Sequence, residues 1–131
     1  MKTPRRRARE LAVQALYQAG INNTAAPEIA KNIQDQPDFA KADEELFNKL
    51  FFGTHTHAAE YIQQIRPLLD RDEKDLSPIE RAVLLMAFHE FSAIPETPYP
   101  VIINEAIEVT KTFGGTDGHK FVNGILDKLA A

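Results

Sequence analysis

Residues 77–91 read SPIERAVLLMAFHEF, and the rest of the architecture follows from this stretch. Its opening is typical of a helix start, because Ser77 can cap the first turn, Pro78 suits the first helical position and Glu80 can reach back to the Ser77 amide. The residues that follow are apolar on nearly every face of a helix, which indicates burial on all sides. We therefore predict a central buried helix that ends near residue 94.

Three helices are expected before this one. Thr3 and Pro4 signal the start of the first, and we expect Gly20 to end it in a left-handed conformation. A short helix should follow Pro27, and a long one should run from about residue 40 to about residue 69. The predicted apolar side of the long helix consists of Leu46, Phe47, Leu50, Phe51, His57, Ala58, Tyr61, Ile62 and Ile65.

Two helices are expected after the central one, which a charged and solvated turn over residues 70–76 precedes. The first spans about residues 101–113, with Ile103, Ala106, Ile107 and Thr110 inward. Gly114 and Gly115 should end it, and Thr116 or Asp117 should cap the last helix. The core face of that last helix is predicted to consist of Phe121, Val122, Ile125, Leu126 and Leu129.

The chain shows no sustained alternation of apolar and polar residues and no hairpin turn between β-branched runs, so no strand is expected. It also shows no internal repeat. We predict an all-α fold, a compact bundle of about six to seven helices. The length of 131 residues is that of one domain, here residues 1–131.

Composition excludes several classes of protein. With 44% apolar residues the chain can build a core, and with no cysteine it has neither disulfides nor thiolate zinc sites. No apolar run approaches the roughly 18–20 residues of a membrane helix, and no apolar signal-peptide core follows the basic start. These features fit a cytoplasmic protein.

Charge is distributed unevenly along the chain. The net charge is -4, yet the first ten residues carry +4, so the remainder carries -8. Guanidinium groups match phosphate oxygens, which makes the basic start a candidate RNA or DNA contact, although a solvated terminus is also a common use of such a run. The charged residues of this start are Lys2, Arg5, Arg6, Arg7, Arg9 and Glu10.

An aromatic residue follows the basic start on the same helix. Arg6, Val13 and Tyr17 lie within about 20° of one line on an α-helix. A tyrosine ring beside cationic groups suits the stacking of single-stranded RNA bases. The alternative is that Tyr17 is a core-edge residue with its hydroxyl in water.

A second candidate element lies between residues 113 and 124. It combines a helix end, a glycine pair and a new helix start, whose free amides favour phosphate. Lys120 and Asn123 share a polar flank, and Phe113 is either a stacking surface or an apolar plug. Asp117 has an equally plain role as a helix cap.

Catalytic interpretations find little support. His55 and His57 point about 160° apart on a helix and cannot share a metal, whereas His89 is expected to be a hydrogen-bonded core histidine and His119 stands alone. The chain has no phosphate loop and no recognised hydrolase or metalloprotease motif. We expect no enzyme, no cofactor and no metal.

Four blocks of the sequence resemble the NusB family in the same order and at matching spacing. They are RRRARELAVQALYQ at residues 5–18, ERAVLLMAFHEF at 80–91, PYPVIINEAIEVTKTFG at 98–114 and DGHKFVNGILDKLA at 117–130. The resemblance implies two packed helical subdomains. It also implies a bacterial antitermination factor that binds the boxA element of nascent ribosomal RNA leaders. It would do so with a small-subunit ribosomal protein, called NusE in this role, and join RNA polymerase.

The resemblance also assigns residues to these roles. Glu80 matches a family acid at the NusE contact, where Leu84 is expected as well, and an acid suits a basic ribosomal protein. The positions that match RNA-contacting positions of the family are Arg5, Arg6, Arg7, Arg9, Tyr17, Phe113, Asp117, Lys120 and Phe121, and Lys2 is expected to join them. This interpretation requires the basic start and the segment around residues 113–121 to form one positive surface.

The chain departs from the family pattern at four positions. Members commonly have serine where Gly118 stands, often arginine at Leu85 and tyrosine at His89, and some have an aromatic residue at Leu68. These changes bear on the finer RNA and partner contacts. Two alternatives remain: a helical protein–protein module without specific RNA binding, and the RNA-targeting domain of an RNA-modifying enzyme, against which the absence of a nucleotide-binding sheet argues.

Overall fold

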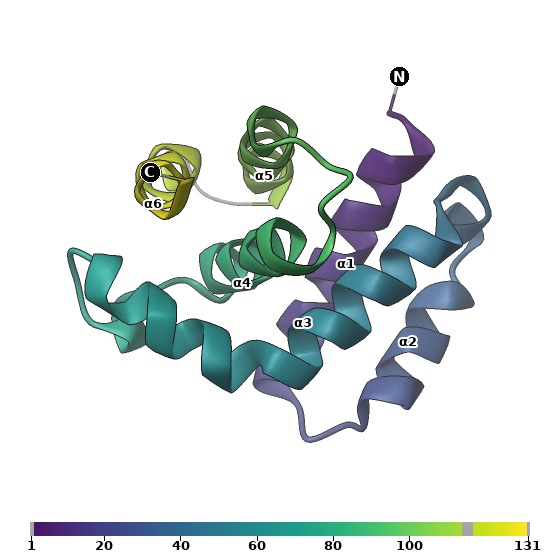
Figure 1. Ribbon diagram of the computed structural model, residues 1–131. Coiled ribbons are helices and arrows are strands. Elements are labelled where there is room, and N and C mark those ends of the chain that lie inside the picture. The colour runs from purple at the N-terminus through teal and green to yellow at the C-terminus, as the bar shows by residue number, and fades with distance from the viewer. Residues whose placement is uncertain (1, 114–116, 131) are drawn as a thin grey trace. The chain divides into compact units, whose positions relative to one another are not determined.

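The computed structural model describes residues 2–113 and 117–130, and these residues form six α-helices and three short 3₁₀ helices with no strand among them (Figure 1). The all-α prediction is therefore confirmed. The α-helices are α1 (Pro4–Ile21), α2 (Ala26–Gln34), α3 (Glu44–Ile65), α4 (Pro78–Ala93), α5 (Tyr99–Phe113) and α6 (Gly118–Ala130), and the 3₁₀ helices are η1 (Pro37–Lys41), η2 (Arg66–Leu68) and η3 (Glu73–Asp75).

The chain divides into two compact units, Met1–Thr56 and His57–Ala131, and the division falls within α3. We call them unit 1 and unit 2. Two helical units are what the family resemblance implies. Among the described residues, no helix combines the length and apolar character needed to cross a membrane.

Unit 1 is held together by aromatic and aliphatic packing among α1, α2, η1 and the first part of α3. The start of α1 follows the prediction, since the Thr3 hydroxyl accepts a hydrogen bond from the Arg6 amide at 3.1 Å. The Phe47 ring packs edge-on against Phe39 at 5.2 Å and stacks with Phe51 at 5.9 Å between centroids. Both Phe47 and Phe51 are fully buried, so this aromatic row forms the centre of the unit.

The end of α1 differs from the prediction. Gly20 does not end the helix in a left-handed conformation, because the helix continues to Ile21 and no described glycine has a positive φ. Asn22 instead takes an extended conformation and its amide donates to the Gln18 carbonyl at 2.9 Å. The last turn is therefore closed without the left-handed residue that a glycine would supply.

Unit 2 is built around α4, as predicted. The Ser77 hydroxyl accepts a hydrogen bond from the Glu80 amide at 3.0 Å, which starts the helix. Residues 82–87 are all buried, and α5 and α6 pack against α4 and against each other. The second part of α3 joins them through Tyr61, whose ring lies 4.7 Å from that of Phe88.

The inward face of α5 is rotated from the predicted one. Ile103 and Ile107 are only half-buried, and the buried positions are Ile102, Glu105, Ala106, Val109 and Thr110. An acid at position 105 breaks the apolar pattern, which is why apolar spacing pointed to the neighbouring line of residues.

Three smaller expectations also change. His57, predicted on the apolar side of α3, is exposed. Phe121 and Leu129, predicted in the core face of α6, are half-buried. The expected roles of Gly114, Gly115 and Thr116 concern residues outside the described ones.

Truncating the aromatic row of unit 1 should be costly. We expect Phe47→Ala to lower the free energy of unfolding by about 3–5 kcal/mol, because it leaves a cavity in a close-packed core. Ile21→Ala is the matched control, since this side chain is 55% exposed and should change stability by less than about 0.5 kcal/mol. Urea denaturation measures both, and a similar small loss in the two variants would contradict this account of the core.

Candidate nucleic-acid interface

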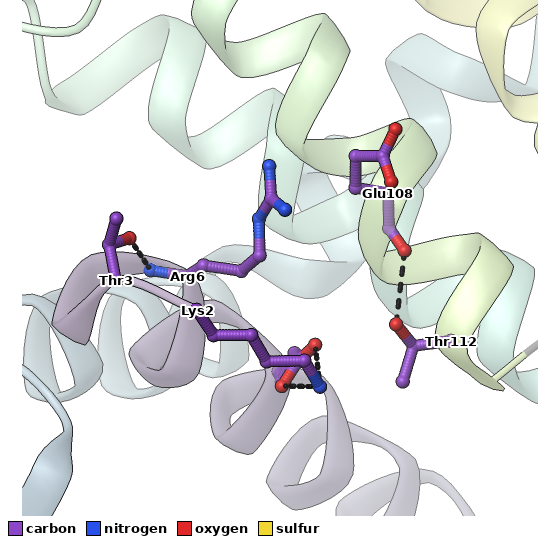
Figure 2. A network of polar contacts seen from close by, with 6 residues as sticks. Lys2, Thr3, Arg6, Glu108 and Thr112 are labelled. Atoms are coloured by element: carbon purple, nitrogen blue, oxygen red, sulfur yellow. Dashed lines mark hydrogen bonds and ion pairs between the residues drawn. The ribbon is translucent and has the colours of Figure 1, made fainter.

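The basic start of unit 1 is partly engaged by acids of the same unit. Lys2 Nζ lies 3.0 and 2.9 Å from the two carboxylate oxygens of Glu10 (Figure 2). Arg5 lies 3.7 Å from the carboxylate of Asp43, and its side chain remains 52% exposed. A looser and solvated pair of this kind contributes little to stability and can be exchanged for another anion.

The other arginines differ in how far they reach solvent. Arg6 and Arg7 are half-buried, whereas Arg9 is 2% exposed. Arg9 lies one helical turn before Ala12 and Val13, which are fully buried, and it therefore faces inward. Because Arg9 reaches little solvent, its part in an RNA-contacting surface stays a prediction.

Tyr17 is available for stacking. It is 37% exposed, so part of its side chain reaches solvent. Arg6 lies eleven residues earlier, three turns along the same side of α1. Val13, expected on that same line, is fully buried and does not contribute to an exposed face.

The second candidate element lies in unit 2, from the end of α5 to the first turn of α6. Phe113 and Phe121 are half-buried. Asp117 precedes α6, and its carbonyl accepts hydrogen bonds from the amides of Lys120 and Phe121 at 3.1 and 3.4 Å. Near the end of α5, the Thr112 hydroxyl donates to the Glu108 carbonyl at 3.2 Å (Figure 2).

The two charges of this element offset each other. Lys120 Nζ lies 3.4 Å from a carboxylate oxygen of Asp117, and both side chains are about three-quarters exposed. The element therefore brings no net positive charge of its own, and its aromatic rings are the features that distinguish it.

An arginine that the sequence placed in a solvated turn lies on one of these rings. The Arg71 guanidinium carbon is 4.2 Å from the centroid of the Phe121 ring, a cation–π contact. Arg71 Nε also donates to the Asp70 carboxylate at 2.9 Å, and this hydrogen bond lowers the pKa of Asp70. The two residues in contact are fifty positions apart, so no local pattern could have predicted the pair.

The segment between α3 and α4 is solvated, as predicted, since five of residues 70–76 are exposed, and ion pairs also anchor it. Glu73 binds Arg66 at 2.7 Å and Arg81 at 3.6 Å. From α6, Lys128 Nζ donates to the Leu68 carbonyl at 3.3 Å. Leu76 at the end of the segment is buried.

The two residues predicted to contact a protein partner differ in exposure. Leu84 is fully buried in the core of unit 2, so it does not reach a partner surface. Glu80 is half-buried and lies against the start of α6. A Cβ at Gly118 would be 3.2 Å from a Glu80 carboxylate oxygen and 3.4 Å from Thr110 Cγ2. The glycine therefore permits a close approach of Glu80 to α6.

One of the four histidines lies in the core of unit 2. His89 is buried, and its Nδ1 lies 2.7 Å from the Tyr61 hydroxyl, which confirms the prediction of a hydrogen-bonded core histidine. Burial raises the pKa of Tyr61, with a further contribution from Glu60. Within residues 2–113 and 117–130, no three His, Cys, Asp or Glu side chains are grouped so that they could hold a metal ion.

Comparison with known proteins gives a consistent result. The model of the NusB family matches residues 6–131. The chain is 87% identical to "Transcription antitermination protein NusB" of Neisseria meningitidis serogroup A, over 100% of this chain and 93% of that protein. It is 57% identical to the protein of the same name from Chromobacterium violaceum, over 100% and 89% respectively. A solved structure of NusB from T. maritima has a TM-score of 0.85 and 31% identity, and covers 99% of this chain and 92% of that chain.

The pairs made by Glu73 should give stability a defined pH dependence. The hydrogen bond from Arg66 lowers the pKa of Glu73 from its ordinary value of 4.5. The stabilisation is therefore present above pH 4.5 and is lost as pH falls through the lowered pKa. Glu73→Gln should be less stable than the parent at pH 7, by under about 1 kcal/mol because the pair is partly solvated.

Urea denaturation at pH 7 and at about pH 3 tests this sign. The difference between parent and Glu73→Gln should shrink at the acid pH, because protonation of Glu73 removes the charge that Arg66 and Arg81 bind. Glu96→Gln, which removes an exposed acid before α5, serves as the control and should make little difference at either pH. A difference for Glu73→Gln that persists unchanged in acid would show that the ion pairs are not its source.

Proposed function

The chain belongs to the NusB family, and from this membership we propose that it is a bacterial transcription antitermination factor that binds single-stranded boxA RNA together with NusE. We propose further that the complex joins the antitermination machinery on RNA polymerase, so that the protein works in the cytoplasm. The relatives are named as a transcription antitermination protein, a regulatory factor, which confirms the prediction that the chain is not an enzyme.

The observation that carries the proposed RNA binding is the exposed Tyr17 ring on the same side of α1 as Arg6. Single-stranded RNA is bound through base stacking on aromatic rings combined with cationic contacts to the backbone. Arg5 and Arg7 add cationic groups at the start of the same helix, whereas the buried Arg9 is not included. Lys2 contributes once its pair with Glu10 opens.

The second proposed RNA element is the unit 2 segment with Phe113, Asp117, Lys120 and Phe121. Because the Lys120 charge is offset by Asp117, this element should contribute through stacking more than through phosphate attraction. We therefore expect the cations of unit 1 to supply most of the salt-dependent affinity, and the aromatic rings of both units to contact bases.

The proposed NusE contact rests on Glu80 and on overall charge. Outside the basic start the chain carries -8, which suits a basic partner such as a ribosomal protein. Glu80 lies at the start of α4 and retains partial exposure. Leu84 is left out of this proposed contact because it lies in the core.

A gel-shift titration tests the RNA proposal. With NusE present, boxA RNA should bind more tightly than a scrambled strand, and affinity should fall steeply as salt rises. Arg5→Ala, Arg6→Ala and Arg7→Ala should each weaken binding and reduce the salt slope by about one. Tyr17→Ala should lose about 1–3 kcal/mol through lost stacking.

Lys49→Ala is the control for these variants, because it removes an exposed cation of unit 1 that lies on α3 rather than α1. It should leave boxA affinity nearly unchanged. Equal and weak binding of boxA and scrambled RNA at moderate salt, in the presence of NusE, would instead support a helical protein–protein module.

The partner proposal has its own measurement. Glu80→Gln should weaken NusE binding by about 1 kcal/mol or more, measured by titration calorimetry, because it removes a charge that complements a basic surface. Glu60→Gln removes an exposed acid from the same unit and should leave NusE binding unchanged. Unaltered affinity in Glu80→Gln would remove Glu80 from the interface.

A further inference from the structure

The segment that joins α3 to α4 lies along one face of α6. Phe121 and Lys128 are seven residues apart, two turns of the helix, and so lie on the same side. Phe121 carries the Arg71 guanidinium at 4.2 Å, and Lys128 holds the Leu68 carbonyl at 3.3 Å. Two separate contacts therefore place Arg71 over the ring of Phe121.

The charge of Arg71 is already balanced within unit 2. Its Nε binds Asp70, and the charges of Glu80 and Asp75 also act on it and raise its pKa. A guanidinium paired with a carboxylate attracts phosphate less than an unpaired one. The pairing with acids does not prevent the planar guanidinium from stacking on an aromatic ring.

The ring of Phe121 is half-buried while Arg71 covers part of it. A half-exposed phenyl ring on a helix surface can turn about its side-chain torsions unless a neighbour restricts it. The cation over the ring supplies that restriction, and a ring that is already fixed loses less entropy when a base stacks on it.

We propose that Arg71 is a positioning residue for RNA binding, which holds the Phe121 ring in place for stacking with one RNA base and does not itself contact a phosphate. This inference rests on the proposed function, because it assigns a role within the same RNA element. It adds a residue that belongs to none of the four sequence blocks resembling the family.

The test is a double-mutant cycle on boxA affinity at several salt concentrations, with NusE present. Arg71→Ala should weaken binding about threefold to tenfold with an unchanged salt slope, since no phosphate contact is lost. In a Phe121→Ala background, Arg71→Ala should have no further effect. Arg71→Lys, which keeps the charge and loses the planar group, should recover only part of the affinity.

Lys74→Ala is the matched control, since it removes another exposed cation of the same segment that pairs with Asp72 rather than with a ring. It should leave boxA affinity within twofold of the parent. Thermal unfolding of each variant separates a loss of positioning from a loss of folded protein.

Three results would overturn the inference. One is parental affinity in Arg71→Ala, and another is equal losses with and without Phe121. The third is a salt slope reduced by about one, which would make Arg71 a direct phosphate contact. Failure of the proposed function is seen separately, in a parent protein that does not prefer boxA RNA over a scrambled strand, and that result overturns both.

Discussion

The burial of α4 is the constraint on which the rest of unit 2 depends. Its residues 82–87 are buried, so α5 and α6 present apolar faces to it, and the second part of α3 contacts it through the Tyr61 and Phe88 rings. With those faces packed against α4, the other sides of these helices are available for polar contacts. The first turn of α6 and the segment before α4 then meet at Phe121 and Arg71, at the edge of the buried face of α6.

In unit 1 a single helix serves both the core and the candidate interface. Ala8, Ala12 and Ala15 of α1 are fully buried, and this inward side also takes Arg9 out of solvent. The cations that remain accessible are fewer than the composition of the first ten residues indicates. Part of their charge is paired with Glu10 and Asp43, and the solvated Arg5–Asp43 pair contributes little to stability.

Local patterns predicted local structure well. The caps at Thr3 and Ser77, the buried α4 and the all-α class depend on residues a few positions apart, and all were predicted. The register of α5 was missed because Glu105 occupies a buried position that apolar spacing assigns to its neighbours. The contact between Arg71 and Phe121 could not be predicted, because it depends on how a charged segment is laid along a distant helix.

The close approach of Glu80 to Gly118 links the space available at the two positions. Any larger side chain at 118 would meet the carboxylate at 80, so the space available to one residue is set by the other. A side chain at 118 is accommodated when the Glu80 carboxylate shifts by a few tenths of an ångström. A carboxylate tip can move aside more readily than backbone can, so the side chain at 80 would move rather than the backbone of α6.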